Sequence, residues 1–229
     1  MSRAEIHHQH RDVSGGWLRP AVFGANDGLV SNFALMTGVA GGSTGRTAVI
    51  LAGLAGLLAG AFSMAAGEWV SVRTQAELVE AEIANERREL HERPEAEQAE
   101  LAGVFVDRGV DPELAREVAA QLSTDPDGVL DIHTLIELGE VPGGQPSAWV
   151  AAGSSFLAFA LGAVIPLVPY VFGAQSLLPA AIVSVIGLFA IGLAASKVTR
   201  RSWWFSGLRQ VAIGSAAALV TFWVGTLIG

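Results

Sequence analysis

The chain has 229 residues, no cysteine and a formal net charge of −8. Hydrophobic residues make up 51% of it and its mean hydropathy is +0.46, values above those of ordinary soluble domains. The absence of cysteine excludes disulfides, thiolate metal sites and thiol catalysis. Residues 68–140 hold 19 of the 22 Asp and Glu but only 6 of the 14 Lys and Arg. This acidic segment attracts cations and argues against nucleic acid as a partner.

Five apolar stretches are long enough to cross a membrane. They cover residues 20–41, 47–70, 148–171, 176–197 and 206–228. Each has about 22 residues, which as a helix rising about 1.5 Å per residue spans the ~30 Å hydrocarbon core of a bilayer. We predict an all-α membrane protein with an N-terminal arm (1–19), transmembrane helices 1 and 2 (20–70), an acidic helical insert (71–146) and transmembrane helices 3 to 5 (147–229).

The first apolar stretch contains a carboxylate, Asp27, together with the polar residues Asn26, Ser31 and Asn32. A charge at membrane depth costs several kcal/mol, so such residues usually face a cavity, a partner or an ion path. The first hypothesis is therefore a membrane protein that moves or binds a cation. The alternative for Asp27 is a structural hydrogen bond between helices.

The second apolar stretch ends with Met64 and Glu68, which share a helix face at i and i+4. The first two spans are joined by a short loop and should be neighbours, with Asp27 and Met64 at comparable depth. A carboxylate with a thioether suits a transition ion such as Fe²⁺ better than Mg²⁺ or Ca²⁺, which prefer oxygen ligands. The alternative for Met64 alone is a packing residue.

The acidic insert is predicted to be helical throughout. Its first helix (71–92) continues the second span, Pro94 starts a second helix that Gly109 stops, and Asp111-Pro112 opens a third. A turn at 124–128 precedes a last short helix that reaches about Leu138. Residues 139–147, rich in Gly and Pro, lead back to the membrane.

Carboxylates recur at helical spacing within this insert. The candidate stripes are Glu82, Glu86 and Glu89 on the first helix, Glu97 and Glu100 on the second, and the pair His133 and Glu137 on the last. Facing helices that each offer acidic side chains can share metal ions. The alternative is a set of solvated faces in which Arg87, Arg88 and Arg93 pair with these carboxylates.

Three further patterns carry weaker signals. His7, His8 and His10 offer imidazoles near the N-terminus, where chain arms are usually disordered. Pro166 and Pro169 should kink or end the third span. Small residues at Gly53, Gly56 and Gly60 mark a face that another helix can approach closely, either within the protomer or across a dimer.

Basic residues predict the orientation of the chain. With the N-terminus in the cytoplasm, 13 Lys and Arg lie in cytoplasmic segments and only Arg46 lies on the opposite side. Because cytoplasmic segments carry the excess of Lys and Arg, the N-terminus and the insert are predicted to be cytoplasmic. We also expect a bacterial cytoplasmic membrane, since no targeting extension or signal-peptide pattern is visible.

Four segments together resemble the vacuolar iron transporter family of Fe²⁺ and Mn²⁺ transporters. They are Arg11–Pro20, Gly24–Asn32, Gly60–Glu68 and Ile165–Tyr170. The resemblance covers nearly the whole chain and implies five transmembrane helices per protomer, a homodimer with the pathway at its interface, and a cytoplasmic metal-binding insert. It also implies exchange of the metal ion for protons.

The resemblance assigns roles to individual residues. Asp27 and Met64 match the family's intramembrane metal site, and the Pro-Glu-x-Glu-x-x-Glu and Glu-Leu-Gly patterns match its insert. The implied insert ligands are Glu86, Glu89, Glu97, Glu100 and Glu137. Two positions depart from the family: His133 and Thr134 stand where the best-known members have a Met pair, and Gly56 stands where some members have Glu. His133 would still bind Fe²⁺ or Mn²⁺, and Glu68 is a conjectured replacement for the missing acid.

The first hypothesis is a proton-coupled transporter that removes Fe²⁺ or Mn²⁺ from the cytosol, with Asp27 alternating between metal and proton. It is not an enzyme, and it needs no prosthetic group because the metal ion is its substrate. A rival is a membrane-anchored metal-binding or sensing protein that does not transport. A third reading, a ferroxidase, is disfavoured because the Glu-x-x-His pairs of di-iron bundles are incomplete.

Overall fold

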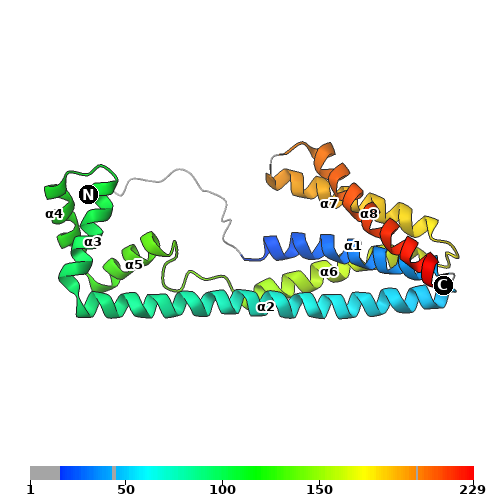
Figure 1. The fold of residues 1–229 in the computed structure, drawn as a ribbon, viewed down its shortest axis with the longest axis horizontal. Coiled ribbons are helices and arrows are strands. Elements are labelled where there is room, and N and C mark those ends of the chain that lie inside the picture. Colours follow the sequence, from blue (N-terminus) through cyan, green and yellow to red (C-terminus); the bar gives the residue numbers. More distant parts are fainter. Residues whose placement is uncertain (1–15, 43–44, 200) are drawn as a thin grey trace. The chain divides into compact units, whose positions relative to one another are not determined.

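The computed structural model describes residues 16–42, 45–199 and 201–229. Every regular element in these ranges is an α-helix, and eight are present (Figure 1). The chain forms two compact units, one from the residues up to Ser71 together with Ser147–Gly229, and one from Val72–Pro146. Helix α2 (Arg46–Glu92) runs through the boundary between them.

The first unit contains long apolar helices. They are α1 (Leu18–Gly41), the first part of α2, α6 (Ala148–Val171), α7 (Leu178–Thr199) and α8 (Trp203–Ile228). Each predicted apolar stretch corresponds to one of these helices, although α7 begins two residues later and α8 three residues earlier than the sequence suggested. Four of them, α2, α6, α7 and α8, are long and apolar enough to cross a membrane. The chain is thus an all-α protein with several membrane-spanning candidates.

Helix α1 differs from the other four because it is less apolar. It has 24 residues but is not among the four most apolar helices. Asn26, Asp27 and Asn32 lower its mean hydropathy, since each replaces an apolar side chain within the helix. It nevertheless packs against α6, α7 and α8, which leaves Leu29, Phe33 and other apolar residues of α1 buried.

Two glycines bring the backbones of α1 and α6 into close contact. A Cβ atom on Gly28 would collide with the backbone of Phe159, and a Cβ atom on Gly162 would collide with the carbonyl of Ala25. Only glycine fits at such an approach. The sequence therefore forces α1 and α6 together at the level of residues 25–28.

The small-residue face of α2 packs within the protomer. Gly53 faces Met36 and Leu167, Gly56 faces Leu35 and Asn32, and Gly60 faces Phe159. At the start of α2, Arg46 donates from Nε to the carbonyl oxygen of Tyr170 at 2.9 Å and from Nη2 to that of Val171 at 3.3 Å. This guanidinium adds side-chain hydrogen bonds to carbonyls at the end of α6, where the regular helical bonds stop. Helix α6 continues through Pro166 and Pro169 and ends at Val171, so neither proline itself ends the helix.

The second unit contains the rest of α2 with three short helices, α3 (Pro94–Asp107), α4 (Pro112–Leu122) and α5 (Pro126–Glu137). Each of the three begins with proline at its first position, where the missing N–H costs nothing. Asp111 caps α4 by accepting hydrogen bonds from the backbone N–H of Glu113 and Leu114. The turn predicted at 124–128 is shorter than expected, because α5 already begins at Pro126.

Apolar side chains hold the short helices together. Leu101 and Ala102 of α3 pack with Ala115 and Ala119 of α4 and with Val129 of α5. A second cluster joins Val79 and Ile83 of α2 to Leu130 of α5. This packing sets α5 beside α2 and α3, so the polar face of α5 meets theirs.

Candidate metal sites

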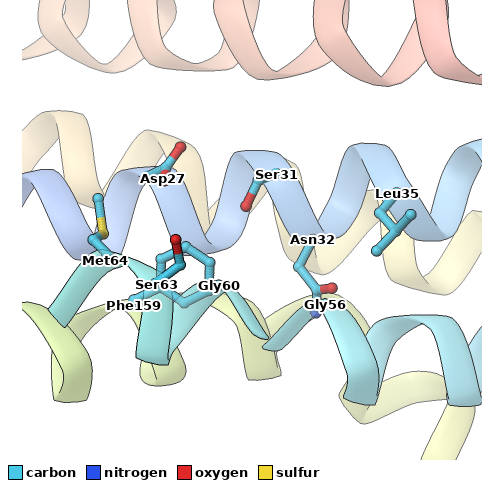
Figure 2. Close-up of a pocket in the computed structure, with 9 residues that line it drawn as sticks. All are labelled: Asp27, Ser31, Asn32, Leu35, Gly56, Gly60, Ser63, Met64 and Phe159. Carbon is cyan, nitrogen blue, oxygen red and sulfur yellow. The ribbon is translucent and has the colours of Figure 1, made fainter. Parts of the chain in front are cut away.

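A pocket of about 460 Å³ lies in the first unit. Its lining residues come from α1, α2 and α6, and they are Asp27, Ser31, Asn32, Leu35, Gly56, Gly60, Ser63, Met64 and Phe159. The sequence placed Asp27 and Met64 at comparable depth on neighbouring helices, and both line this pocket. Figure 2 shows them near the same end of the row of lining residues.

The pocket contains oxygen and sulfur ligands but no cationic side chain. Asp27 is half-buried in the protomer, Ser31 is exposed, and Met64 is partly buried against the cluster of Ala61, Phe159 and Ala163. A carboxylate with hydroxyls and a thioether is a donor set for a divalent transition ion. Glu68, the further pathway candidate, is partly buried on α2 but does not line the pocket.

Asn32 is the most deeply buried polar residue of the pocket. Its side chain is 1% exposed, and its Nδ2 donates to the carbonyl oxygen of Ala163 at 2.6 Å. The Oδ1 atom is buried and has no hydrogen-bond partner among the described residues. The sequence identified Asn32 as a polar residue at membrane depth but gave it no separate role. The sequence feature that could have pointed to Asn32 is Gly56 on α2, because a residue without a side chain leaves room for the Asn32 amide.

The second unit brings carboxylates and one imidazole from three helices together. The Nδ1 atom of His133 on α5 lies 3.0 Å from Oε1 of Glu86 on α2, 3.9 Å from Oε2 of Glu97 on α3 and 3.5 Å from Oε1 of Glu137 on α5. Ligand atoms of Glu86, His133 and Glu137 lie within 4.8 Å of one another, as do those of Glu86, Glu89 and Glu97. Glu86 therefore belongs to both groups.

Burial makes this cluster electrostatically unusual. Glu86 and Glu97 are each only 7% exposed, and His133 is 2% exposed. Burial, and then the neighbouring carboxylates of Glu137, Glu97 and Glu89, raise the pKa of Glu86 to about 7, against a smaller opposing effect of His133. Burial, followed by the charge of Glu100, raises the pKa of Glu97. A bound cation would relieve the repulsion that these shifts reflect.

Two polar groups of the cluster have no hydrogen-bond partner among the described residues. They are Oε1 of Glu86, although it faces the imidazole, and Nε2 of His133. Buried polar atoms are normally satisfied, so this unsatisfied pair is consistent with a ligand such as a metal ion that binds at the cluster. Thr134, beside His133, donates instead to the carbonyl of Leu130 within its own helix.

The remaining predicted residues lie around this cluster. Glu100 is exposed and close enough to Glu97 to influence it, but it belongs to neither ligand group. Glu82 accepts from Asn85 on its own helix. Within the described ranges, no ion pair joins Arg87, Arg88 or Arg93 to the cluster, and Arg88 instead donates to Asn85.

The solvated-face alternative therefore does not describe Glu86 and Glu97. His7, His8 and His10 lie outside the described residues.

Comparison with known proteins gives a consistent assignment. A sequence model described as the VIT family matches residues 18–226. A vacuolar iron transporter of Acanthamoeba castellanii is 39% identical over 208 residues, covering 83% of this chain and 76% of the relative. Vacuolar iron transporter homolog 1 of Oryza sativa is 35% identical over 216 residues (93% and 74%), and vacuolar iron transporter 1 of Arabidopsis thaliana is 28% identical over 220 residues (94% and 88%).

These relatives bear the names of transporters and not of enzymes. The family match includes all five long helices of the first unit and the whole of the second unit. It thus extends over both candidate metal sites. The chain belongs to the VIT family.

Proposed function

We propose that this protein transports a divalent transition-metal ion, Fe²⁺ or Mn²⁺ or both, out of the cytosol across a membrane in exchange for protons. The observation that carries the proposal is the pocket in which Asp27 and Met64 lie together among helices apolar enough to span a bilayer. The relatives named as iron transporters support metal ion transport. The metal ion is the substrate, and the protein needs no prosthetic group.

The proposal treats α1 as a fifth transmembrane helix. It is 24 residues long and packs against α6, α7 and α8. Its polar residues Asp27, Ser31 and Asn32 line the pocket, and polar side chains that face a cavity or a partner are tolerated within a membrane.

In this mechanism the insert collects the metal on the cytosolic side. Its ligands are Glu86, Glu89, Glu97, His133 and Glu137, with Glu100 as an outer carboxylate that draws cations toward them. Carboxylate and imidazole together suit Fe²⁺ and Mn²⁺. The excess of basic residues on one side favours a cytoplasmic insert and N-terminus.

Asp27 and Met64 then pass the ion through the membrane, and Asp27 takes up a proton when the ion leaves. Glu68, near the end of the apolar stretch 47–70 within α2, is a second carboxylate available to the pathway. The bacterial cytoplasmic membrane stays a prediction from the sequence, since the relatives named above are vacuolar transporters of eukaryotes.

We further propose a homodimer with the pathway at its interface. Ser31 is exposed and Asp27 only half-buried in the protomer, although both lie on a helix that we place in the membrane. Polar groups facing lipid are costly, so a second copy that covers this side of α1 and α2 would complete the pathway.

The test is uptake of Fe²⁺ into liposomes that contain the purified protein and carry a pH gradient. With an acidic lumen the parent should concentrate Fe²⁺ and alkalinise the lumen in step, because protons leave in exchange for each ion that enters. Asp27→Asn keeps the size of the side chain and should abolish uptake while metal binding to the insert persists. Parental uptake by Asp27→Asn would show that the intramembrane mechanism is wrong.

A second candidate is a membrane-anchored metal-binding protein without transport activity. The buried cluster of Glu86, Glu97 and His133 favours it, because that cluster alone explains metal binding. Equilibrium binding of Fe²⁺ without any flux in the same liposomes would support this candidate and exclude transport.

A further inference from the structure

Oδ1 of Asn32 is a buried oxygen in the Asp27 pocket, and the proposed transport mechanism assigns it no role. Its orientation is fixed, because Nδ2 donates to the carbonyl of Ala163 at 2.6 Å and a rotated amide would set two acceptors against each other. The oxygen is therefore held on the side that faces α2. Figure 2 shows the Asn32 side chain reaching from α1 toward α2 at Gly56.

The surroundings of this oxygen are apolar and tight. A Cβ atom on Gly56 would lie 2.7 Å from Oδ1 of Asn32 and 2.6 Å from Cδ2 of Leu35. Oδ1 is thus covered by the backbone of α2 at Gly56, with the Leu35 side chain beside it. No described donor satisfies it. A buried acceptor without a donor costs free energy, so its retention beside a polar pocket points to a ligand that is present during function.

We propose that Oδ1 of Asn32 is a second ligand for the transported divalent cation, deeper in the membrane than Asp27 and occluded in this conformation by α2 and Leu35. The inference rests on the proposed transport function. Asn32 is five residues beyond Asp27 on α1, a rise of about 7.5 Å along the helix axis. The ion would bind the carboxylate first and the neutral amide oxygen second, where it is held less strongly and can leave.

Gly56 belongs to the same arrangement. Because any side chain at this position would strike Oδ1, glycine preserves the space that the oxygen faces. Leu35 is partly exposed and rotates about single bonds, so a change of its rotamer removes one of the two groups that cover Oδ1, and a shift of α2 removes the other. The ligand is thereby reachable from the pocket in a second conformation.

Two substitutions of similar size separate a ligand from a structural hydrogen bond. Asn32→Asp keeps an oxygen facing α2 but loses the N–H given to Ala163, whereas Asn32→Leu loses both. Fe²⁺ uptake into liposomes is measured at saturating metal, with thermal unfolding in detergent to check folding. We expect Asn32→Leu to lower the maximal rate by about tenfold, the effect of losing one buried polar partner, and Asn32→Asp to retain most of it.

A pair of glycine variants tests the same oxygen from α2. Gly56→Ala sets a methyl group against Oδ1 and should also lower the maximal rate, whereas Gly67→Ala adds a methyl group with no atom within 4 Å and should transport like the parent. Equal losses in Asn32→Asp and Asn32→Leu would assign Asn32 a purely structural role and overturn the inference, as would parental uptake by Asn32→Leu. If the parent itself moves no Fe²⁺, the proposed function fails first.

Discussion

The Nδ1 atom of His133 lies 3.0 Å from Oε1 of Glu86, and the two residues are 2% and 7% exposed. The imidazole of α5 thus reaches a carboxylate of α2 inside the second unit, and it also lies within 4 Å of a Glu97 oxygen on α3. Because three helices contribute to one buried cluster, metal binding and folding of the insert should be linked. The first two predictions follow from this pair.

Replacing the imidazole should weaken metal binding by the insert. His133→Leu removes the nitrogen ligand but keeps a buried side chain of similar volume. Fe²⁺ affinity should fall at least about 10- to 100-fold, because loss of a residue that only orients a metal ligand already costs that much. In liposomes KM should rise while the maximal rate changes little, because Asp27 is untouched. Titration of the purified full-length protein with Fe²⁺ measures the affinity. His91→Leu, on an exposed part of α2, is the control.

Glu86 should make both metal binding and stability depend on pH. Its pKa is raised from 4.5 to about 7, so the metal-free cluster is stabilised below pH 4.5, and this contribution is lost as pH rises through about 7. Metal requires the ionised carboxylate, so Fe²⁺ affinity should rise over the same interval. Melting temperatures with and without Fe²⁺ between pH 5 and 8 measure both trends. Glu86→Gln should flatten them, and an unchanged pH profile in that variant would contradict the assignment.

Met64 should determine which ions pass. Met64→Leu nearly conserves volume, so folding should be retained, but the loss of the thioether removes the ligand that prefers transition ions. We expect Fe²⁺ uptake to fall several-fold relative to Mn²⁺ uptake. A competition assay with Fe²⁺, Mn²⁺, Co²⁺ and Zn²⁺ in liposomes reports the change. An identical order of ions in parent and variant would mean that Met64 only packs.

The contact of α1 with α6 should tolerate no added methyl group. Gly28→Ala would set a Cβ atom against the backbone of Phe159, so we expect destabilisation of about 1–3 kcal/mol or more, as for other overpacked sites. Gly153→Ala, on α6 with no atom within 4 Å of the added carbon, should leave stability nearly unchanged. Thermal unfolding in detergent compares the two. Equal melting temperatures would mean that the helices separate at little cost.

Helix positions were predictable because their signals are local. Prolines at 94, 112 and 126 begin three helices of the second unit, and the apolar stretches match the long helices of the first. Asp27 was recognisable from the sequence because a single charge in an apolar segment needs no knowledge of its neighbours. Mean hydropathy alone does not identify α1 as a transmembrane helix, because the polar residues that form the candidate site also lower the hydropathy of the helix.

The relations between helices were less predictable. Periodicity shows that Glu97 and Glu100 share a stripe, but only packing shows that Glu97 is buried beside His133 while Glu100 is exposed. The unpaired Oδ1 atom of Asn32 could not be predicted either. Its orientation is set by the hydrogen bond from Nδ2 to the carbonyl oxygen of Ala163, which is 131 residues away in the chain. Such pairings arise from tertiary contacts, which a single sequence does not display.

The glycine contacts at Gly28 and Gly162 have a mechanical consequence. Backbones that touch cannot slide or rotate past each other without a clash, so α1 and α6 form a rigid pair. Asp27 and Asn32 lie on α1 and Ala163 lies on α6, so these residues keep their relative positions when the pair moves. Any opening of the pathway must then shift the membrane part of α2, which carries Met64. In the proposed mechanism the Met64 thioether would therefore move while the Asp27 carboxylate stays in place, so each transport cycle would separate the two.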